Sequence, residues 1–210
     1  MFATVAKFTA AKLTTAAALV LGAALVLQSP VTAGPATVGH IPTGGDTSVP
    51  YGWVDFCQRY RGECNDRTGP AQDIELTSRA LREIERINKW VNKNIEPVSD
   101  MDHWGVVDQW DYPTDGKGDC EDYALLKRKL LAEQGFPMSA LLMTVVRDKH
   151  DDGHAILMVR TDHGDFMLDN LNDDVRGWRQ TGYHFVKRQS QTDPNDWVTL
   201  IDGSGPVASR

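Results

Sequence analysis

Residues 116–134, GKGDCEDYALLKRKLLAEQ, place a single cysteine, Cys120, where a glycine-containing loop becomes a helix. Apolar residues then recur at helical spacing and Gly135 supplies a C-terminal stop, so we predict a helix from about Cys120 to Gln134. A thiol in the first turn of a helix lies near unpaired backbone N–H groups and the positive end of the helix dipole. Both features favour the thiolate, so Cys120 is a candidate nucleophile.

The flanking sequence predicts the fold class. Upstream, Thr77 or Ser78 can cap a helix that Pro97 ends, with apolar residues recurring every three or four positions. Downstream, four short apolar or alternating runs are typical of antiparallel strands joined by turns: they are residues 140–146, 154–160, 165–168 and 183–187. Helices followed by strands predict an α+β domain, with helices packed on an antiparallel sheet.

Two further residues complete a candidate catalytic triad. His154 begins one predicted strand, and Asp169 follows it by fifteen residues, which gives the order Cys, His, Asp. Taken alone, His154 is more simply explained as an ordinary strand histidine. Asp169 alone is more simply explained as a residue of the turn that ends a strand. Together with Cys120 they favour a nucleophile, a general base and a residue that orients the base. The remaining histidines are treated as ordinary: His40, His103, His150, His163 and His184.

The hairpin register is left open by the sequence. His154 and Asp169 lie directly opposite each other if the hairpin centre falls between Thr161 and Asp162. A His163-Gly164 turn instead places Asp169 opposite Met158, about 13 Å along the strand from His154.

Acidic residues surround the cysteine. Asp119, Glu121 and Asp122 oppose formation of a thiolate by like-charge repulsion. Acids are also common in the first turn of a helix, which requires no ligand. A bound Ca²⁺ would cancel the repulsion, and Asp119 and Glu121 are the candidate ligands. Zinc on the three triad residues is less favoured, because metal sites usually take two ligands from one short segment.

The N-terminus has the pattern of a secretory signal. Residues 1–33 contain two lysines, no acid, a 12-residue apolar run and a small-residue cleavage motif. The run is shorter than the ~20 residues that a membrane-spanning helix needs, so a retained anchor is less favoured. We assign residues 1–33 to a signal peptide, 34–50 to a flexible leader, 51–202 to one domain and 203–210 to a frayed tail.

The charge of the chain argues against one class of partner, and its cysteine content predicts one disulfide and one free thiol. The chain has 22 basic and 29 acidic residues, and the remainder after residue 33 has a net charge of −9, which argues against nucleic-acid binding. In an oxidising compartment, Cys57 and Cys64 are expected to form a disulfide, which leaves Cys120 as an unpaired thiol.

These residues resemble the bacterial transglutaminase-like cysteine peptidase family, which includes the LapG-type periplasmic proteases. The resemblance covers roughly residues 51–187, and Gly118-Asp-Cys-Glu-Asp-Tyr123 is its most specific part. Further matching segments are Tyr51-Gly-Trp53 with Phe56-Cys57, Asn88–Asn92, Asp108-Gln-Trp110 with Pro113, Lys127, Gly153-His-Ala155 and Leu168-Asp-Asn170. The stretch 112–118 is shorter than is usual in the family.

The resemblance implies a papain-like, transglutaminase-type fold with Cys120 as nucleophile, His154 as base and Asp169 as orienting acid. It also implies calcium dependence through Asp119 and Glu121, and a protein substrate such as a large surface adhesin. We therefore predict a periplasmic or secreted cysteine endopeptidase. Acyl transfer to an amine, as in transglutaminases and amidases, and a non-catalytic calcium-binding module are the alternatives. Gln109, Trp110 and Tyr112 are candidates for lining the cleft or donating to an oxyanion.

Overall fold

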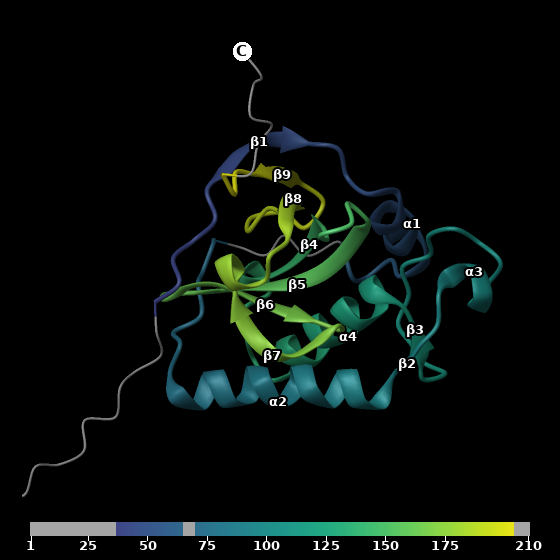
Figure 1. Cartoon of the computed structure of the whole chain (residues 1–210), viewed down its shortest axis with the longest axis horizontal. Helices are drawn as coiled ribbons and strands as arrows, with labels where there is room; N and C mark the ends of the chain where they lie inside the picture. Colours follow the sequence, from purple (N-terminus) through teal and green to yellow (C-terminus); the bar gives the residue numbers. More distant parts are fainter. Residues whose placement is uncertain (1–36, 65–69, 204–210) are drawn as a thin grey trace, which may run out of the picture. The chain divides into compact units, whose positions relative to one another are not determined.

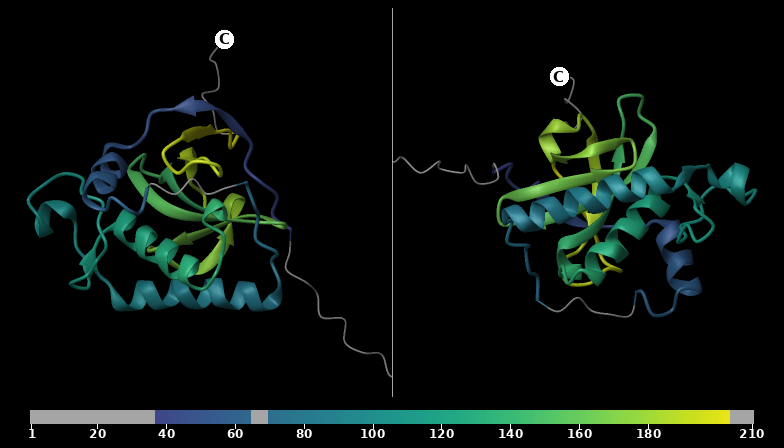
Figure 2. Two further views of the ribbon diagram at one scale, coloured as in Figure 1. Left: turned by 180° about the vertical axis from the view of Figure 1, so that it is seen from behind. Right: turned by 90° about the horizontal axis from the view of Figure 1, so that it is seen from below.

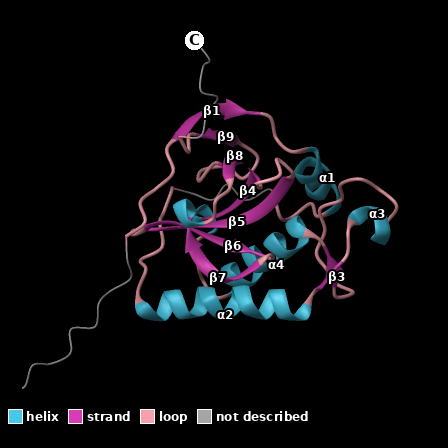
Figure 3. Cartoon of the chain, in the orientation of Figure 1, coloured by secondary structure: helices cyan, strands magenta, loops and turns pink. Residues whose placement is uncertain are grey.

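The computed structural model describes residues 37–64 and 70–203, and its core is a seven-stranded antiparallel sheet (Figures 1 and 3). The strand order is β1-β9-β8-β4-β5-β6-β7, and β2 and β3 form a separate parallel pair. The helices are α1 (Tyr51–Arg59), α2 (Ser78–Asn94), α3 (Asp100–His103) and α4 (Cys120–Glu133). The strands are β1 (Thr43–Thr47), β2 (Glu96–Pro97), β3 (Lys117–Gly118), β4 (Leu141–Arg147), β5 (Gly153–Thr161), β6 (Gly164–Asp169), β7 (Asn172–Gly177), β8 (His184–Gln189) and β9 (Trp197–Leu200).

The predicted α+β class is confirmed. Helix α4 packs against β4, β5 and α2, and α2 also contacts β7, as two further views show (Figure 2). Successive strand residues face opposite sides of a sheet. Thus Met143 and Leu157 join the core shared with α2 and α4, whereas Leu142 and Ile156 join a second cluster on the other face.

Both predicted helices form with the expected ends. Thr77 caps α2, because its side-chain oxygen accepts a hydrogen bond from the backbone N–H of Ala80 at 3.1 Å. Helix α4 ends at Glu133, and Gly135 follows it with a φ of 88°, a left-handed conformation that suits glycine.

The β5–β6 hairpin has neither of the two registers considered from sequence. Its turn is Asp162-His163, since Thr161 pairs with Gly164, and Leu157 pairs with Leu168. Continuing this register places Asp169 beside Ile156, two residues from His154 and on the same face. Gly164 has a φ of 118°, and a Cβ there would lie 2.3 Å from the carbonyl oxygen of Gly39. This close backbone contact requires glycine at the start of β6.

Some predictions of irregular structure are wrong. Residues 34–50 were expected to form a flexible leader, yet Thr43–Thr47 is β1 and pairs with β9. Its sequence, TGGDT, lacks an apolar pattern because this edge strand is held by backbone pairing. Residues 172–177, outside the four predicted strands, form β7. The assigned signal peptide and residues 204–210 lie outside the described part of the chain. Within that part, no helix combines the length and the apolar character needed to cross a membrane.

The predicted disulfide is present. Cys57 and Cys64 are bonded, and Cys120 is the free cysteine. Trp53 and Phe56 of α1 are buried and stack on each other, and Trp53 also meets the edge of Trp110. The bridged segment is thereby joined to the loop that precedes α4.

Candidate active site

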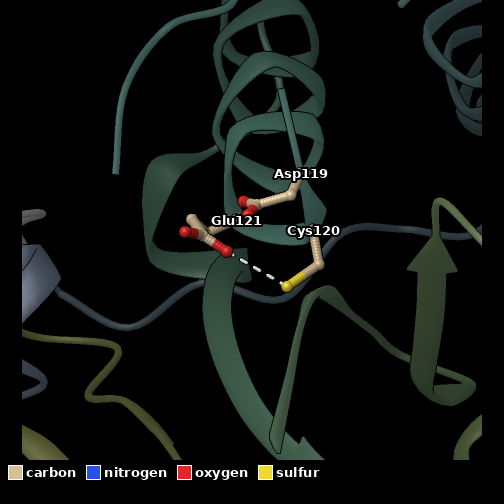
Figure 4. Close-up of side chains that lie close together, drawn as sticks. All are labelled: Asp119, Cys120 and Glu121. Atoms are coloured by element: carbon tan, nitrogen blue, oxygen red, sulfur yellow. Dashed lines mark hydrogen bonds between the residues drawn. The ribbon is translucent and has the colours of Figure 1, made fainter. Parts of the chain in front are cut away.

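Cys120 is the first residue of α4, as the sequence predicts. Its sulfur accepts a hydrogen bond from the backbone N–H of Ala155 at 3.4 Å, so β5 begins directly beside the thiol. The thiol donates to Glu121 Oε2 at 3.0 Å, as Figure 4 shows. The nucleophile candidate thus lies between the start of a helix and the start of a strand.

His154 and Asp169 are hydrogen-bonded to each other. His154 Nε2 lies 2.9 Å from Asp169 Oδ1, and both side chains are largely buried. Asp169 Oδ1 also accepts from the backbone N–H of Leu171 at 3.0 Å, and Oδ2 accepts from the Tyr183 hydroxyl at 2.6 Å. Although burial opposes it, these hydrogen bonds, that of His154 first, lower the pKa of Asp169. The ionised form of Asp169 is therefore stabilised by hydrogen bonds from the protein.

A cleft of about 360 Å³ connects the candidate nucleophile with the candidate base. Cys120 and His154 both line it, so the histidine next to Ala155 faces the same space as the thiol. Because Nε2 is engaged by Asp169, Nδ1 is the ring nitrogen left to exchange a proton in the cleft. The other lining residues are Pro50, Asp108, Trp110, Glu121, Val145, Gly153, Ala155 and Lys187.

The three residues suggested as cleft or oxyanion groups have different positions. Trp110 lines the cleft, but its indole N–H donates to Asp108 Oδ1 at 3.0 Å and its ring packs against Trp53 and Trp197. The backbone N–H of Gln109 donates to Asp100. Tyr112 packs on Phe56 and Tyr60 and does not line the cleft. A packing role therefore accounts for Trp110 and Tyr112.

Acidic residues cluster on the nucleophile side of the cleft. Three overlapping groups of side chains have ligand atoms within 4.8 Å of one another. They are Asp119 with Cys120 and Glu121, Asp100 with Asp119 and Asp122, and Asp100 with Asp108 and Glu121. The two residues predicted as calcium ligands, Asp119 and Glu121, thus belong to a larger acidic cluster. Asp100 and Asp108 come from α3 and the following loop, which the sequence does not connect to the cysteine.

The cluster fits a hard cation. The Oδ1 atoms of Asp100 and Asp119 are buried and have no hydrogen-bond partner among the described residues. Salt bridges in this part of the chain involve other acids, such as Asp55, Asp111 and Asp115. Several carboxylate oxygens with free lone pairs are what Ca²⁺ prefers. Among the described residues, no metal-binding group joins Cys120 to His154 and Asp169, so the zinc alternative gains no support.

On the cysteine side of the cleft, the surroundings disfavour the negatively charged forms of the acids and of the thiol. Burial, followed by the charge of Asp119, raises the pKa of Glu121 to about 9, and burial raises that of Asp122 to about 8. Burial and then Glu121 raise the pKa of the Cys120 thiol well above its usual value. The thiolate expected from the helix terminus alone is thus opposed by its surroundings, as the flanking acids suggested.

A buried lysine lies behind the histidine side. Lys127 is fully buried on α4, and its Nζ has no hydrogen-bond partner among the described residues. Burial lowers the pKa of Lys127 to about 7, while the charges of Asp169 and Asp173 act to raise it. Lys127 is therefore an electrostatic neighbour of Asp169 whose charged form is disfavoured by burial.

The profile of the family described as bacterial transglutaminase-like cysteine proteinase, BTLCP, matches residues 43–204. The chain belongs to the BTLCP family. Membership confirms the family expected from the sequence, its transglutaminase-like fold and its enzyme class, cysteine peptidase. No curated protein matches the chain.

Among solved structures, this BTLCP chain is similar to LapG of Legionella pneumophila. The calcium-bound form matches at 23% identity with a TM-score of 0.46, covering 51% of this chain and 63% of LapG. The EGTA-treated form matches at 23% identity with a TM-score of 0.45, covering 51% of this chain and 61% of LapG. This chain therefore spans less than two thirds of the length of the LapG chains it matches.

Proposed function

We propose that this protein is a cysteine endopeptidase that uses Cys120, His154 and Asp169 as a catalytic triad. The observation that carries the proposal is the shared cleft. Cys120 and His154 line it, and Asp169 holds the far nitrogen of the imidazole at 2.9 Å. A nucleophile, a base and an orienting acid in this relation are the elements of acyl transfer through a covalent intermediate.

The proposed reaction begins with transfer of the thiol proton from Cys120 to His154 Nδ1. The thiolate attacks the substrate carbonyl carbon, and backbone N–H groups at the start of α4 stabilise the oxyanion. The imidazolium then protonates the leaving amine as the C–N bond breaks, which leaves a thioester on Cys120. His154 next accepts a proton from water, whose oxygen attacks the thioester and releases the carboxylic acid. Asp169 keeps the imidazole oriented throughout.

We further propose that the acidic cluster binds Ca²⁺, through Asp119 and Glu121 and with Asp100 and Asp108 as additional ligands. The unpartnered carboxylate oxygens and the raised pKa values of the buried acids support this assignment. When bound, a divalent cation supplies the positive charge that offsets the acids next to the nucleophile. Asp122 is not included among the proposed ligands, since its Oδ1 accepts a hydrogen bond from the backbone N–H of Asp111 at 2.7 Å.

The substrate class follows from the proposed export of the protein. A secreted or periplasmic peptidase meets other exported proteins, and a large surface adhesin, implied by the resemblance of the sequence, is the first substrate to test. Lys187 lines the cleft and belongs to neither the proposed triad nor the proposed calcium site, so an acidic substrate side chain can be accommodated beside it.

The test is alkylation of the only free thiol by iodoacetamide. We expect rapid modification in the wild-type protein, none in Cys120→Ala, and strongly slowed modification in His154→Ala. A rate that is unchanged in His154→Ala would reject the activated pair. Mass analysis of a candidate adhesin then separates two reactions: cleaved fragments support the peptidase, whereas an amide-linked product without cleavage supports amine acyl transfer.

A further inference from the structure

Tyr183 contacts the His154–Asp169 pair and is not among the residues that line the cleft. It precedes β8, and its hydroxyl donates to Asp169 Oδ2 at 2.6 Å. The backbone is fixed by a tight turn in which the N–H of Tyr183 donates to Thr181 Oγ1 at 3.2 Å. The Thr181 hydroxyl in turn donates to the carbonyl of Trp178 at 2.8 Å. The tyrosine is therefore held from its backbone as well as from its hydroxyl.

The two oxygens of Asp169 have divided roles. Oδ1 accepts from His154 and from the backbone of Leu171, whereas Oδ2 has Tyr183 as its donor. A carboxylate fixed through one oxygen can still turn about its terminal torsion, which has a broad energy profile. The hydrogen bond to Oδ2 prevents this rotation and keeps Oδ1 directed at His154 Nε2.

The ring of Tyr183 also covers the pair. Its centroid lies 5.6 Å from that of the His154 imidazole, with an angle of 59° between the planes. A hydrogen bond to a charged group is stronger when water cannot compete for it. The ring thus shields the same interaction that the hydroxyl orients.

We propose that Tyr183 is a positioning residue of the catalytic site, which holds the Asp169 carboxylate in the orientation that His154 requires. The proposal rests on the proposed triad, since Tyr183 acts only through Asp169. The hydroxyl remains a donor throughout the working pH range, because burial and the hydrogen bond to Asp169 raise the pKa of Tyr183.

Other charged groups act on this pair, and none of them replaces the hydroxyl. Lys127 on α4 is an electrostatic partner of Asp169. Arg176 on β7 and Asp148 after β4 act on Tyr183 with opposite signs. These interactions are unchanged by a Tyr183→Phe substitution, which removes one oxygen atom.

The experiment compares Tyr183→Phe with Tyr123→Phe. The Tyr123 hydroxyl donates a hydrogen bond of equal length, 2.6 Å, to the carbonyl of Ile95, so the control loses a matched bond to a neutral acceptor. The first measurement is the rate of Cys120 alkylation by iodoacetamide at pH 7. We expect a decrease of about tenfold to a hundredfold in Tyr183→Phe, as for a misplaced catalytic group, and less than twofold in Tyr123→Phe.

The second measurement is the melting temperature as the pH is lowered from 7. Asp169 has a lowered pKa in the folded protein, so its stabilising hydrogen bonds are present at pH 7 and are lost as the pH falls through that pKa. The melting-temperature difference between wild type and Tyr183→Phe should therefore shrink as the pH is lowered from 7 towards the pKa of Asp169. The difference for Tyr123→Phe should not change with pH.

The outcomes are distinct. A folded Tyr183→Phe protein that is alkylated at the wild-type rate overturns the proposal, even if it is less stable. If Tyr183→Phe does not fold, Tyr183→Trp, which keeps an aromatic cover without the hydroxyl, is subjected to the same measurements and the same criterion. If His154→Ala leaves alkylation unchanged, the triad itself is rejected, whereas slow alkylation of His154→Ala with a normal rate in Tyr183→Phe rejects only the role of Tyr183.

Discussion

On the histidine side of the cleft, both oxygens of Asp169 accept hydrogen bonds, and the buried Lys127 is an electrostatic neighbour. On the cysteine side, carboxylate oxygens of Asp100 and Asp119 are buried without a partner among the described residues. The histidine half of the site is therefore completed by the protein alone. The other half has the composition of a site completed by a cation from solution.

The largest expected effect comes from breaking the complete half. Asp169→Ala removes the acceptor for His154 and should slow Cys120 alkylation by about a thousandfold, as for loss of an orienting acid. Asp169→Asn should lose less, because its Oδ1 can still accept from His154 and its amide can donate to the Tyr183 oxygen, as in the Cys-His-Asn arrangement of papain-like proteases. Equal losses in the two variants would show that the charge matters more than the geometry.

The incomplete half should respond to calcium. At a calcium concentration of 100 times Kd, binding adds about 2.7 kcal/mol of stability. For a domain of this size that corresponds to a rise of roughly 5–10 °C in melting temperature. Glu121→Gln and Asp119→Asn should each reduce this response and the accompanying gain in alkylation rate.

The matched control is Asp115→Asn. Asp115 lies four residues before Asp119 in the chain but pairs with His103 at the surface. This variant should keep the full calcium response. A calcium-induced rise in melting temperature that is the same in all three variants would place the ion elsewhere.

The smallest effect tests the buried lysine behind the complete half. An ammonium buried without a hydrogen-bond acceptor is costly, and Lys127 has no such acceptor among the described residues. Lys127→Met should therefore raise the free energy of unfolding by about 1 kcal/mol, measured by urea denaturation. Lys89→Met, at an exposed position of α2, should change it by less than about 0.5 kcal/mol. A large loss of stability in Lys127→Met would mean that the ammonium is well solvated inside the fold.

The sequence predicted the two long helices because their apolar residues follow the helical repeat and their ends carry a cap and a glycine stop. The sequence also predicted the central strands, because they are short apolar or alternating runs. It could not predict β1, whose TGGDT sequence contributes backbone pairing to an edge and almost no buried surface. The hairpin register depended on Gly39 packing against Gly164, a contact between segments over a hundred residues apart.

In the candidate site, too, some residues could be predicted from the sequence and others depend on tertiary contacts. Cys120, His154 and Asp169 could be proposed because their residue types and order have a chemical meaning. Asp100, Asp108 and Tyr183 could not, since each reaches the site from a loop or strand end whose direction depends on tertiary packing. The Asp100 carboxylate, for example, accepts from the backbone N–H of Gln109, a contact that depends on the path of the loop and not on the Gln109 side chain.

The Cys57–Cys64 bridge leaves one thiol in the whole chain. If an oxidant converts Cys120 to a sulfenic acid, no second cysteine in the molecule can resolve it as an internal disulfide. Recovery then requires a thiol from outside, and without one the sulfur can proceed to the irreversible sulfinic and sulfonic acids. The lifetime of the enzyme in an oxidising compartment would therefore depend on the supply of small reducing thiols.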